Sequence, residues 1–347
     1  MTKFEDMKIE DIYDTARLFK PMGETYRDTI QMPMEAINTG IIPLDEALQG
    51  IMPNDFVVVG ATTGAGKTAL ASKIAKTAAL EGKKVALFAL EAYEGEISDR
   101  IKFPRIATRW FKEKGFPLEY KKWKRGVYNE MGLPEIEQEV IKETPELLKE
   151  NLLIRYRTSS EYSVEDFLHE IECLTYKEKI DLIVVDHLHY FSLPDDVSEN
   201  KAIKKIVNKL RDYGLLQEIP IVLFAHMRKK SYATKTVVPA LDEFHGSSEI
   251  TKNATQVITF APAYEIKMPT TYQYPTYIQV GKDRFNGGIK RYVMCTSFDI
   301  RKGEYEEDYI LFNQKGNDEI ERVDDSKLPE WATHAKRAGY QTSLGSV

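Results

Sequence analysis

The sequence has few cysteines, since Cys173 and Cys295 are the only two among 347 residues. Two isolated cysteines exclude a disulfide framework and offer no metal-ligand spacing, which is typical of a protein in a reducing compartment. No run reaches the roughly 18 consecutive apolar residues that a membrane-spanning helix needs. The N-terminus has acidic residues and no apolar segment behind them, so it does not resemble a signal peptide. These absences predict a soluble, cytoplasmic protein.

A basic excess is also missing, because 54 acidic residues outnumber 48 basic ones and the net charge is −6. This balance argues against a protein that coats nucleic acid over its whole surface, although it leaves room for a local basic site. Hydrophobic residues make up 42% of the chain, enough to bury a sizeable core.

Short apolar runs alternate with helical patterns along much of the chain. Strands are predicted at 56–59, 85–90, 180–185, 219–225, 256–261 and 277–280, and helices at 41–48, 68–80 and 201–216. This alternation indicates an α/β fold with a mostly parallel central sheet flanked by helices, and residues 291–312 predict a terminal β-hairpin. We expect an N-terminal arm (1–33), a core (34–312) with a helical excursion (102–150), and a polar C-terminal tail (313–347).

The strongest motif follows the first predicted strand and opens the next helix. It reads Ala61-Thr62-Thr63-Gly64-Ala65-Gly66-Lys67-Thr68, with alanine in place of the usual first glycine. In such a P-loop, backbone N–H groups and the helix N-terminus bind phosphate. We expect Lys67 to reach the β- and γ-phosphates of ATP, and the Thr68 hydroxyl to ligate Mg²⁺.

Two carboxylates follow predicted strands. Asp186 ends an apolar strand, as a Walker B aspartate does, and is expected to hold Mg²⁺. Glu91 ends the strand after the P-loop helix, where a carboxylate could act as general base on the attacking water.

With these sites in register, residues 38–312 resemble the DnaB-like replicative helicases, including phage ring helicases. The further matches are Thr39-Gly40, Leu44-Asp45, Arg100, Asp186-His187-Leu188, the strand 219–226 ending in His226, Gly246-Ser247-Ser248-Glu249-Ile250, and Lys282-Asp283-Arg284-Phe285-Asn286-Gly287. The resemblance implies a RecA-like P-loop NTPase core that hydrolyses ATP with Mg²⁺. It also implies that Arg100 contacts the nucleotide and that His226 senses the γ-phosphate. Arg284, with Lys282, would then act in trans on the neighbouring subunit's ATP.

The same resemblance implies a homo-oligomeric ring, expected to be a hexamer, that translocates on single-stranded DNA in a bacterial or phage-infected cytoplasm. A primase or a helicase loader would be its protein partner. The DNA-binding loops would be 192–205 and 228–248, the second carrying Arg228, Lys229, Lys230 and Lys235. Trp110 to Arg125 is better explained by helix packing than by nucleic-acid binding, and His187, His189 and His245 lack metal-ligand spacing.

Two other functions remain open. A RecA- or RadA-type recombinase shares the P-loop, Glu91 and the Walker B strand, although the Lys-x-Arg segment favours the helicase. An ATP-gated assembly protein without unwinding activity is the second alternative, because only about 35 residues precede the core where cellular helicases carry a separate domain.

Overall fold

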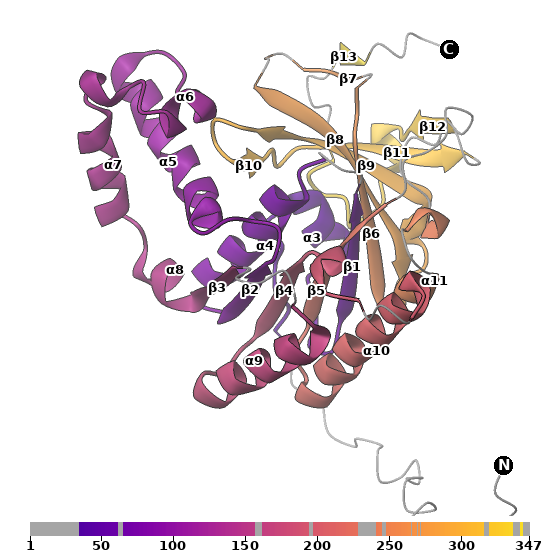
Figure 1. Ribbon diagram of the computed structural model, residues 1–347. Coiled ribbons are helices and arrows are strands. Elements are labelled where there is room, and N and C mark those ends of the chain that lie inside the picture. Colours follow the sequence, from indigo (N-terminus) through magenta and orange to yellow (C-terminus); the bar gives the residue numbers. More distant parts are fainter. Residues whose placement is uncertain are drawn as a thin grey trace, which may run out of the picture. The chain divides into compact units, whose positions relative to one another are not determined.

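A computed structural model of the protein describes residues 35–61, 65–156, 162–193, 197–227, 241–244, 248–264, 266–268, 270, 272–315, 319–335 and 341–342. The chain divides into two units, Met1–Glu35 and Ala36–Val347. The second unit carries every element described below, and Figure 1 labels most of them.

The second unit is built on an 11-stranded sheet (Figure 1). Its strands run in the order β12-β11-β9-β8-β6-β1-β5-β4-β2-β3, with β10 pairing to β9. The parallel part consists of β6 (Gln256–Pro262), β1 (Phe56–Ala61), β5 (Ile221–His226), β4 (Leu182–Asp186), β2 (Val85–Ala89) and β3 (Leu152–Tyr156). The predicted α/β fold with a parallel sheet is therefore confirmed.

The antiparallel part of the sheet is larger than the single hairpin expected. It contains β8 (Gln273–Asp283), β9 (Tyr292–Asp299), β10 (Glu304–Tyr305), β11 (Ile310–Lys315) and β12 (Glu319–Arg322). The predicted hairpin corresponds to β9 and β11. The expected boundary at residue 312 falls inside β11, and Val323, Ala332 and Ala335 are buried in the main core. Apolar residues are sparse in this stretch, which is why the sequence alone suggested a polar tail.

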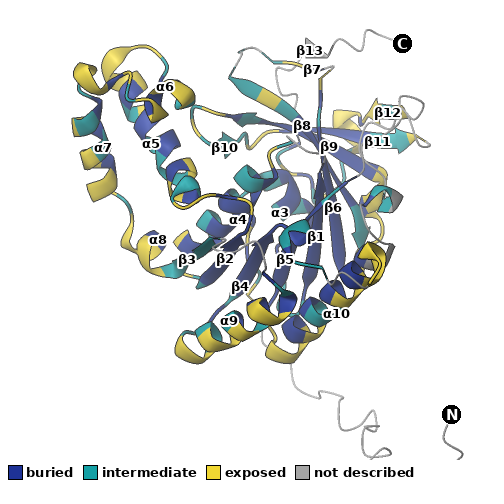
Figure 2. Ribbon diagram, viewed as in Figure 1, coloured by how far each residue is buried: buried dark blue, intermediate teal, exposed yellow. Residues whose placement is uncertain are grey.

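Helices cover both faces of the parallel strands, because successive strand side chains point to opposite faces. Val57 and Val59 pack with α3 (Ile42–Leu48) and α4 (Lys67–Leu80), while Phe56 and Val58 belong to the core on the opposite face. The helices of that opposite face are α9 (Val164–Lys177), α10 (Glu199–Gln217) and α11 (Ser248–Asn253). Figure 2 shows the buried strands between helices whose outer surfaces are exposed.

A separate small core occupies the stretch for which a helical excursion is expected. Its elements are α5 (Glu96–Lys114), α6 (Tyr120–Lys124), η2 (Asn129–Met131) and α7 (Leu133–Lys142), followed by α8 (Glu146–Asn151). Trp110 is fully buried, with its ring centroid 5.2 Å from that of Tyr128, and Trp123 is 8% exposed. Both tryptophans therefore serve helix packing, as expected.

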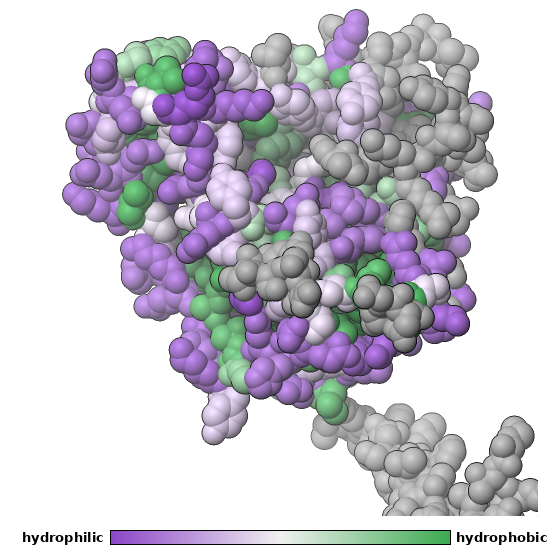
Figure 3. All heavy atoms as spheres, viewed as in Figure 1, coloured by the Kyte–Doolittle hydropathy of each residue, from purple (hydrophilic) through white to green (hydrophobic). Residues whose placement is uncertain are grey.

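Sequence reasoning missed β3 and α9. Every residue of β3 is partly exposed because β3 forms the edge of the sheet, and this weakens its apolar signal. Apolar side chains gather beside this edge in Figure 3, on a face that is otherwise mostly hydrophilic. Helix α9 begins with a capping box, in which the Ser163 hydroxyl accepts from the Asp166 backbone N–H. None of the described helices is both long and apolar enough to cross a membrane.

Candidate nucleotide-binding and hydrolysis site

Four parallel strands bring the candidate site residues together at the carboxyl ends of the strands. Ala61 at the end of β1 pairs in register with His226 at the end of β5, and Ala89 of β2 pairs with Asp186 of β4. Because the carboxyl ends of parallel strands meet at one edge, this is where an open α/β sheet binds its ligand.

The P-loop leads from β1 into α4 at this edge. Gly66 precedes the helix with φ +87°, a left-handed conformation that favours glycine, and Lys67 is the first helical residue. Ala65, Gly66, Lys67 and Thr68 therefore surround the N-terminus of a 14-residue helix, which favours bound anions. Thr62, Thr63 and Gly64 lie outside the described residues.

The Lys67 side chain is 6% exposed and points back over the strand ends. Its Nζ lies 3.4 Å from the Ala61 carbonyl oxygen and 3.0 Å from His226 Nδ1. Burial lowers the pKa of Lys67, while the charges of Asp186 and Glu91 act in the opposite direction. An ammonium group held this way is suited to a bound polyphosphate.

Asp186 is fully buried, and neither of its carboxylate oxygens has a hydrogen-bond partner among the described residues. Burial, together with the charge of Glu91, raises the pKa of Asp186 to about 6, while the neighbouring Thr68 hydroxyl and the charge of Lys67 act in the opposite direction. Unpartnered carboxylate oxygens beside a hydroxyl are the hard ligands that Mg²⁺ takes. Asp186 and Thr68 thus fit the predicted metal role.

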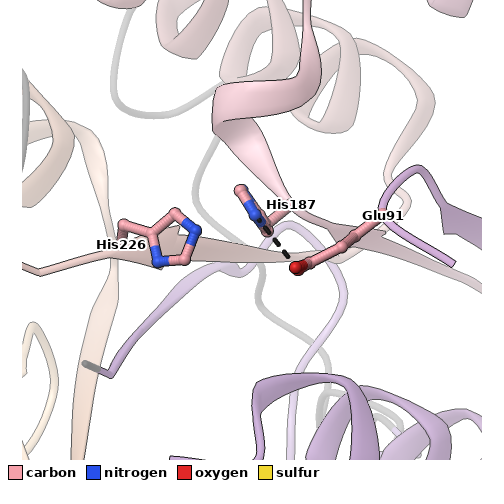
Figure 4. A group of neighbouring side chains, drawn as sticks. All are labelled: Glu91, His187 and His226. Carbon is pink, nitrogen blue, oxygen red and sulfur yellow. Dashed lines mark ion pairs between the residues drawn. The ribbon is translucent and has the colours of Figure 1, made fainter. Parts of the chain in front are cut away.

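Glu91 lies just beyond β2, beside the end of β4. The Leu90 N–H donates to the Asp186 carbonyl at 2.8 Å, which ties the two strand ends together. The Glu91 side chain is 44% exposed, and its Oε2 lies 3.3 Å from His187 Nε2. Figure 4 shows His187 between Glu91 and His226. A half-exposed carboxylate at this edge can reach water, as a general base must.

Two histidines that sequence reasoning did not assign to the site, His187 and His189, lie beside His226 at these strand ends. The rings of His187 and His226 are 4.1 Å apart between centroids, and His189 Nδ1 accepts from the His226 backbone N–H at 3.5 Å. Burial lowers the pKa of His187 to about 2, with the charges of His226, His189 and Lys67 contributing. His187 is therefore neutral at neutral pH, and its contact with Glu91 is not an ion pair.

Glu91, His187 and His226 offer ligand atoms that all lie within 4.8 Å of one another, a set that could hold a metal ion. The hydrogen bonds fit this poorly. His226 Nδ1 faces the Lys67 ammonium, and His187 Nδ1 accepts the His189 N–H at 3.2 Å, which leaves the proton on Nε2. A metal would have to displace that proton and tolerate the nearby cation. The buried carboxylate of Asp186 is the better cation ligand.

Arg100 lies on α5, and its guanidinium pairs with Glu96 at 2.6 Å. It lines a cavity of about 540 Å³ between α4, α5 and the antiparallel strands. Tyr274 and Phe298 lie on the strand side of this cavity, and Ala69 and Ser72 lie on α4 directly after the P-loop. The structure thus places Arg100 beside the P-loop helix, and its contact with the nucleotide stays a prediction.

Arg284 and Lys282 lie toward the opposite end of the strands, level with the amino end of β1. Gln256 is opposite both Val57 at the start of β1 and Asp283 at the end of β8. Arg284 is therefore level with the beginning of β1, about 13 Å or more along the strand from the P-loop, since a strand rises ~3.3 Å per residue. Its exposed side chain makes no hydrogen bond or ion pair with the described residues.

Lys282 has a contact that the sequence did not predict. Its Nζ donates to the carbonyl oxygens of Thr251, Lys252 and Ala254, at 2.8, 3.1 and 2.7 Å. These carbonyls surround the C-terminus of α11, a position that favours a cation. The predicted DNA-binding residues Arg228, Lys229, Lys230 and Lys235 lie outside the described residues.

The P-loop before α4, the carboxylates at two strand ends and the sheet order define a P-loop NTPase with a RecA-like core. The chain belongs to the DnaB-like helicase C-terminal domain family, whose model matches residues 36–302.

Its relatives agree with this assignment. Over 256 residues the chain is 23% identical to a probable plasmid replicative DNA helicase of Chlamydia trachomatis, covering 72% of this chain and 53% of that protein. It is 21% identical over 238 residues to a replicative DNA helicase DnaB of Mycoplasma pneumoniae, covering 66% and 47%. The chain spans about half the length of the curated relatives that it matches.

Solved structures share the fold. The ATPase domain of G40P matches with a TM-score of 0.61 and 17% identity, over 86% of this chain and 98% of that one. A DnaB-like replicative helicase, described with its interactions with primase, matches with a TM-score of 0.60 and 17% identity, over 87% and 68%.

Proposed function

We propose that this chain is the ATP-hydrolysing motor of a replicative DNA helicase, which works as a ring on single-stranded DNA. The observation that carries the proposal is that the expected catalytic residues lie at two opposite ends of the strands. Lys67, Asp186 and Glu91 converge at the carboxyl ends of the strands. Arg284 lies level with the opposite, amino ends of these strands. An arginine in that place can complete a nucleotide site only on a neighbouring subunit.

Each residue has a role that follows from its position. The P-loop backbone and Lys67 would bind the phosphates of ATP, and Thr68 and Asp186 would hold Mg²⁺, which neutralises charge on the phosphates when bound. Glu91 would accept a proton from the water that attacks the γ-phosphorus as the bond to the departing ADP oxygen breaks. Arg100 would contact the nucleotide from the adjoining cavity.

His226 supports the coupling of hydrolysis to movement. It ends β5, and its Nδ1 contacts Lys67. The loss of a γ-phosphate beside Lys67 would therefore change the contacts of His226 at the end of this strand. The segment that follows carries Arg228, Lys229, Lys230 and Lys235, for which we propose contacts with the phosphates of single-stranded DNA. A primase or a helicase loader is the proposed protein partner.

The proposal is tested by ATPase assays with and without single-stranded DNA, beside strand displacement on a forked duplex. We expect DNA-stimulated hydrolysis and ATP-dependent displacement. Glu91→Gln should reduce turnover by about 10²–10⁴-fold, since that is what a general base contributes, and it should still bind ATP. The surface variant His169→Gln should match the unaltered protein.

The outcomes separate the alternatives. Hydrolysis that DNA does not change, with no displacement, would favour an ATP-gated assembly protein. Open helical filaments in electron micrographs, in place of closed rings, would favour a recombinase.

A further inference from the structure

The His187 Nε2 atom is a buried polar atom without a hydrogen-bond partner in the described structure. The side chain is 2% exposed, and it comes directly after Asp186 at the end of β4. The ring lies between Glu91 and His226 (Figure 4). A buried donor or acceptor left unpaired costs free energy, so such an atom in a native site calls for a reason.

The hydrogen bonds of the ring define which nitrogen carries the proton. Nδ1 accepts the backbone N–H of His189 at 3.2 Å, so Nδ1 supplies a lone pair. In a neutral imidazole the other nitrogen then bears the hydrogen, which makes Nε2 a donor. Glu91 Oε2 lies 3.3 Å from it.

Glu91 needs a partner of this kind. Its side chain is half-exposed and forms no hydrogen bond or ion pair with any other described side chain. A glutamate with that freedom would sample many rotamers, whereas a general base has to hold one oxygen toward the attacking water. Hydrogen bonds of this type are often long before the substrate binds.

We propose that His187 is a positioning residue for Glu91. As a neutral Nε2–H donor, it holds one carboxylate oxygen and thereby directs the other toward the water. The inference rests on the proposed function, because it assigns Glu91 as the base. His187 does not touch the reacting atoms, and it works through the carboxylate alone.

Three substitutions separate this role from a structural one. His187→Phe keeps an aromatic ring at this position but has neither ring nitrogen. His187→Asn can keep an acceptor for the His189 N–H but does not reach Glu91. His187→Gln carries an amide N–H at about the place of Nε2. The control is His169→Gln, on the exposed surface of α9.

We expect Phe and Asn at position 187 to lower kcat for ATP about 10- to 100-fold, with KM nearly unchanged, since misplacement of a catalytic group has effects of this size. Gln should restore most of the rate. In a Glu91→Gln background, the His187→Phe change should have no further effect, because the group that it positions is gone. Binding of a fluorescent ATP analogue should be equal in all variants.

Normal kcat in His187→Phe, or rescue by Asn and not by Gln, would overturn the proposal. If the Phe variant does not fold, the comparison of Asn with Gln decides. Failure of the proposed function looks different, because the unaltered protein would then hydrolyse no ATP. Normal hydrolysis that requires Glu91 but not His187 would leave the function in place and remove only the positioning role.

Discussion

Asp186 shows the conflict between stability and function in a single residue. Its carboxylate is fully buried, with no described hydrogen-bond partner for either oxygen, and burial raises its pKa to about 6. The folded protein therefore binds this proton more tightly than the unfolded chain, whose value is 3.8. A raised acid pKa means that the ionised carboxylate destabilises the fold, and that stability falls as pH rises from about 4 to 6.

We expect Asp186→Asn to stabilise the nucleotide-free protein while removing Mg²⁺-dependent hydrolysis. The gain above pH 6 should be at most about 3 kcal/mol, since each pKa unit is worth about 1.4 kcal/mol. It should shrink as pH falls toward 4, where both proteins carry a neutral group. Denaturant unfolding of the two proteins between pH 4 and 8 measures the difference. An equal or lower stability of the Asn variant at pH 7.5 would contradict this account.

At the scale of the elements, Lys282 supports helix α11, a structural contact in addition to the role beside Arg284 that the sequence predicts. Lys282 belongs to β8 yet donates to three carbonyls around the end of α11, which has only six residues and needs tertiary support. Because Arg284 follows two residues later, this cap also fixes the end of the strand from which the guanidinium projects.

We expect Lys282→Met to lower stability by about 1–2 kcal/mol, since the cation at a helix C-terminus and its hydrogen bonds are lost. Thermal unfolding measures the loss. Lys290→Met, an exposed change in the same antiparallel region, should leave the midpoint unaltered. If Lys282→Met unfolds normally but loses turnover, the lysine acts on the nucleotide and its capping contacts are incidental.

At the scale of the whole molecule, the roles proposed for Lys67 and Arg284 would require an assembly, because the two residues lie at opposite ends of the strands. The nucleotide is expected at the carboxyl ends of β1, β4 and β5, whereas Arg284 lies level with the start of β1. An arginine side chain is too short to span that separation within one chain, because β6 also lies between β8 and β1. In the proposed ring, one subunit would contribute residues to two nucleotide sites.

We expect the ATPase rate per subunit to rise with protein concentration and to level off as the oligomer forms, with sedimentation following the same curve. Arg284→Ala should bind ATP normally and lose about 10³-fold or more in turnover, the range seen for arginine fingers. Mixed into the unaltered protein, it should reduce activity more than by dilution.

Arg125→Ala, an exposed arginine on the helical excursion, is the matched control and should act as a neutral diluent. A turnover rate that does not depend on concentration, or an active Arg284→Ala protein, would show that the site is complete within one chain.

The sequence by itself located the residues of the candidate site. Each of these residues follows a buried strand or opens a helix; they are Lys67, Thr68, Glu91, Asp186 and His226. Such local patterns can be recognised in the sequence because buried parallel strands are continuous apolar runs. Strand β3 was not legible, since its residues are half-exposed at an edge. The Val323 to Ala335 segment was missed as well, because its few apolar residues are buried by contacts distant in sequence.

Only the tertiary structure decided how these parts face one another. The contact of His187 with Glu91, the capping of α11 by Lys282 and the separation of Arg284 from the P-loop all arise from strand order and register. Neighbouring strands here come from segments up to about 200 residues apart, as Phe56 and Thr255 show. Short-range sequence patterns do not indicate which strands are neighbours, because strand pairing is set by the packing of the whole sheet.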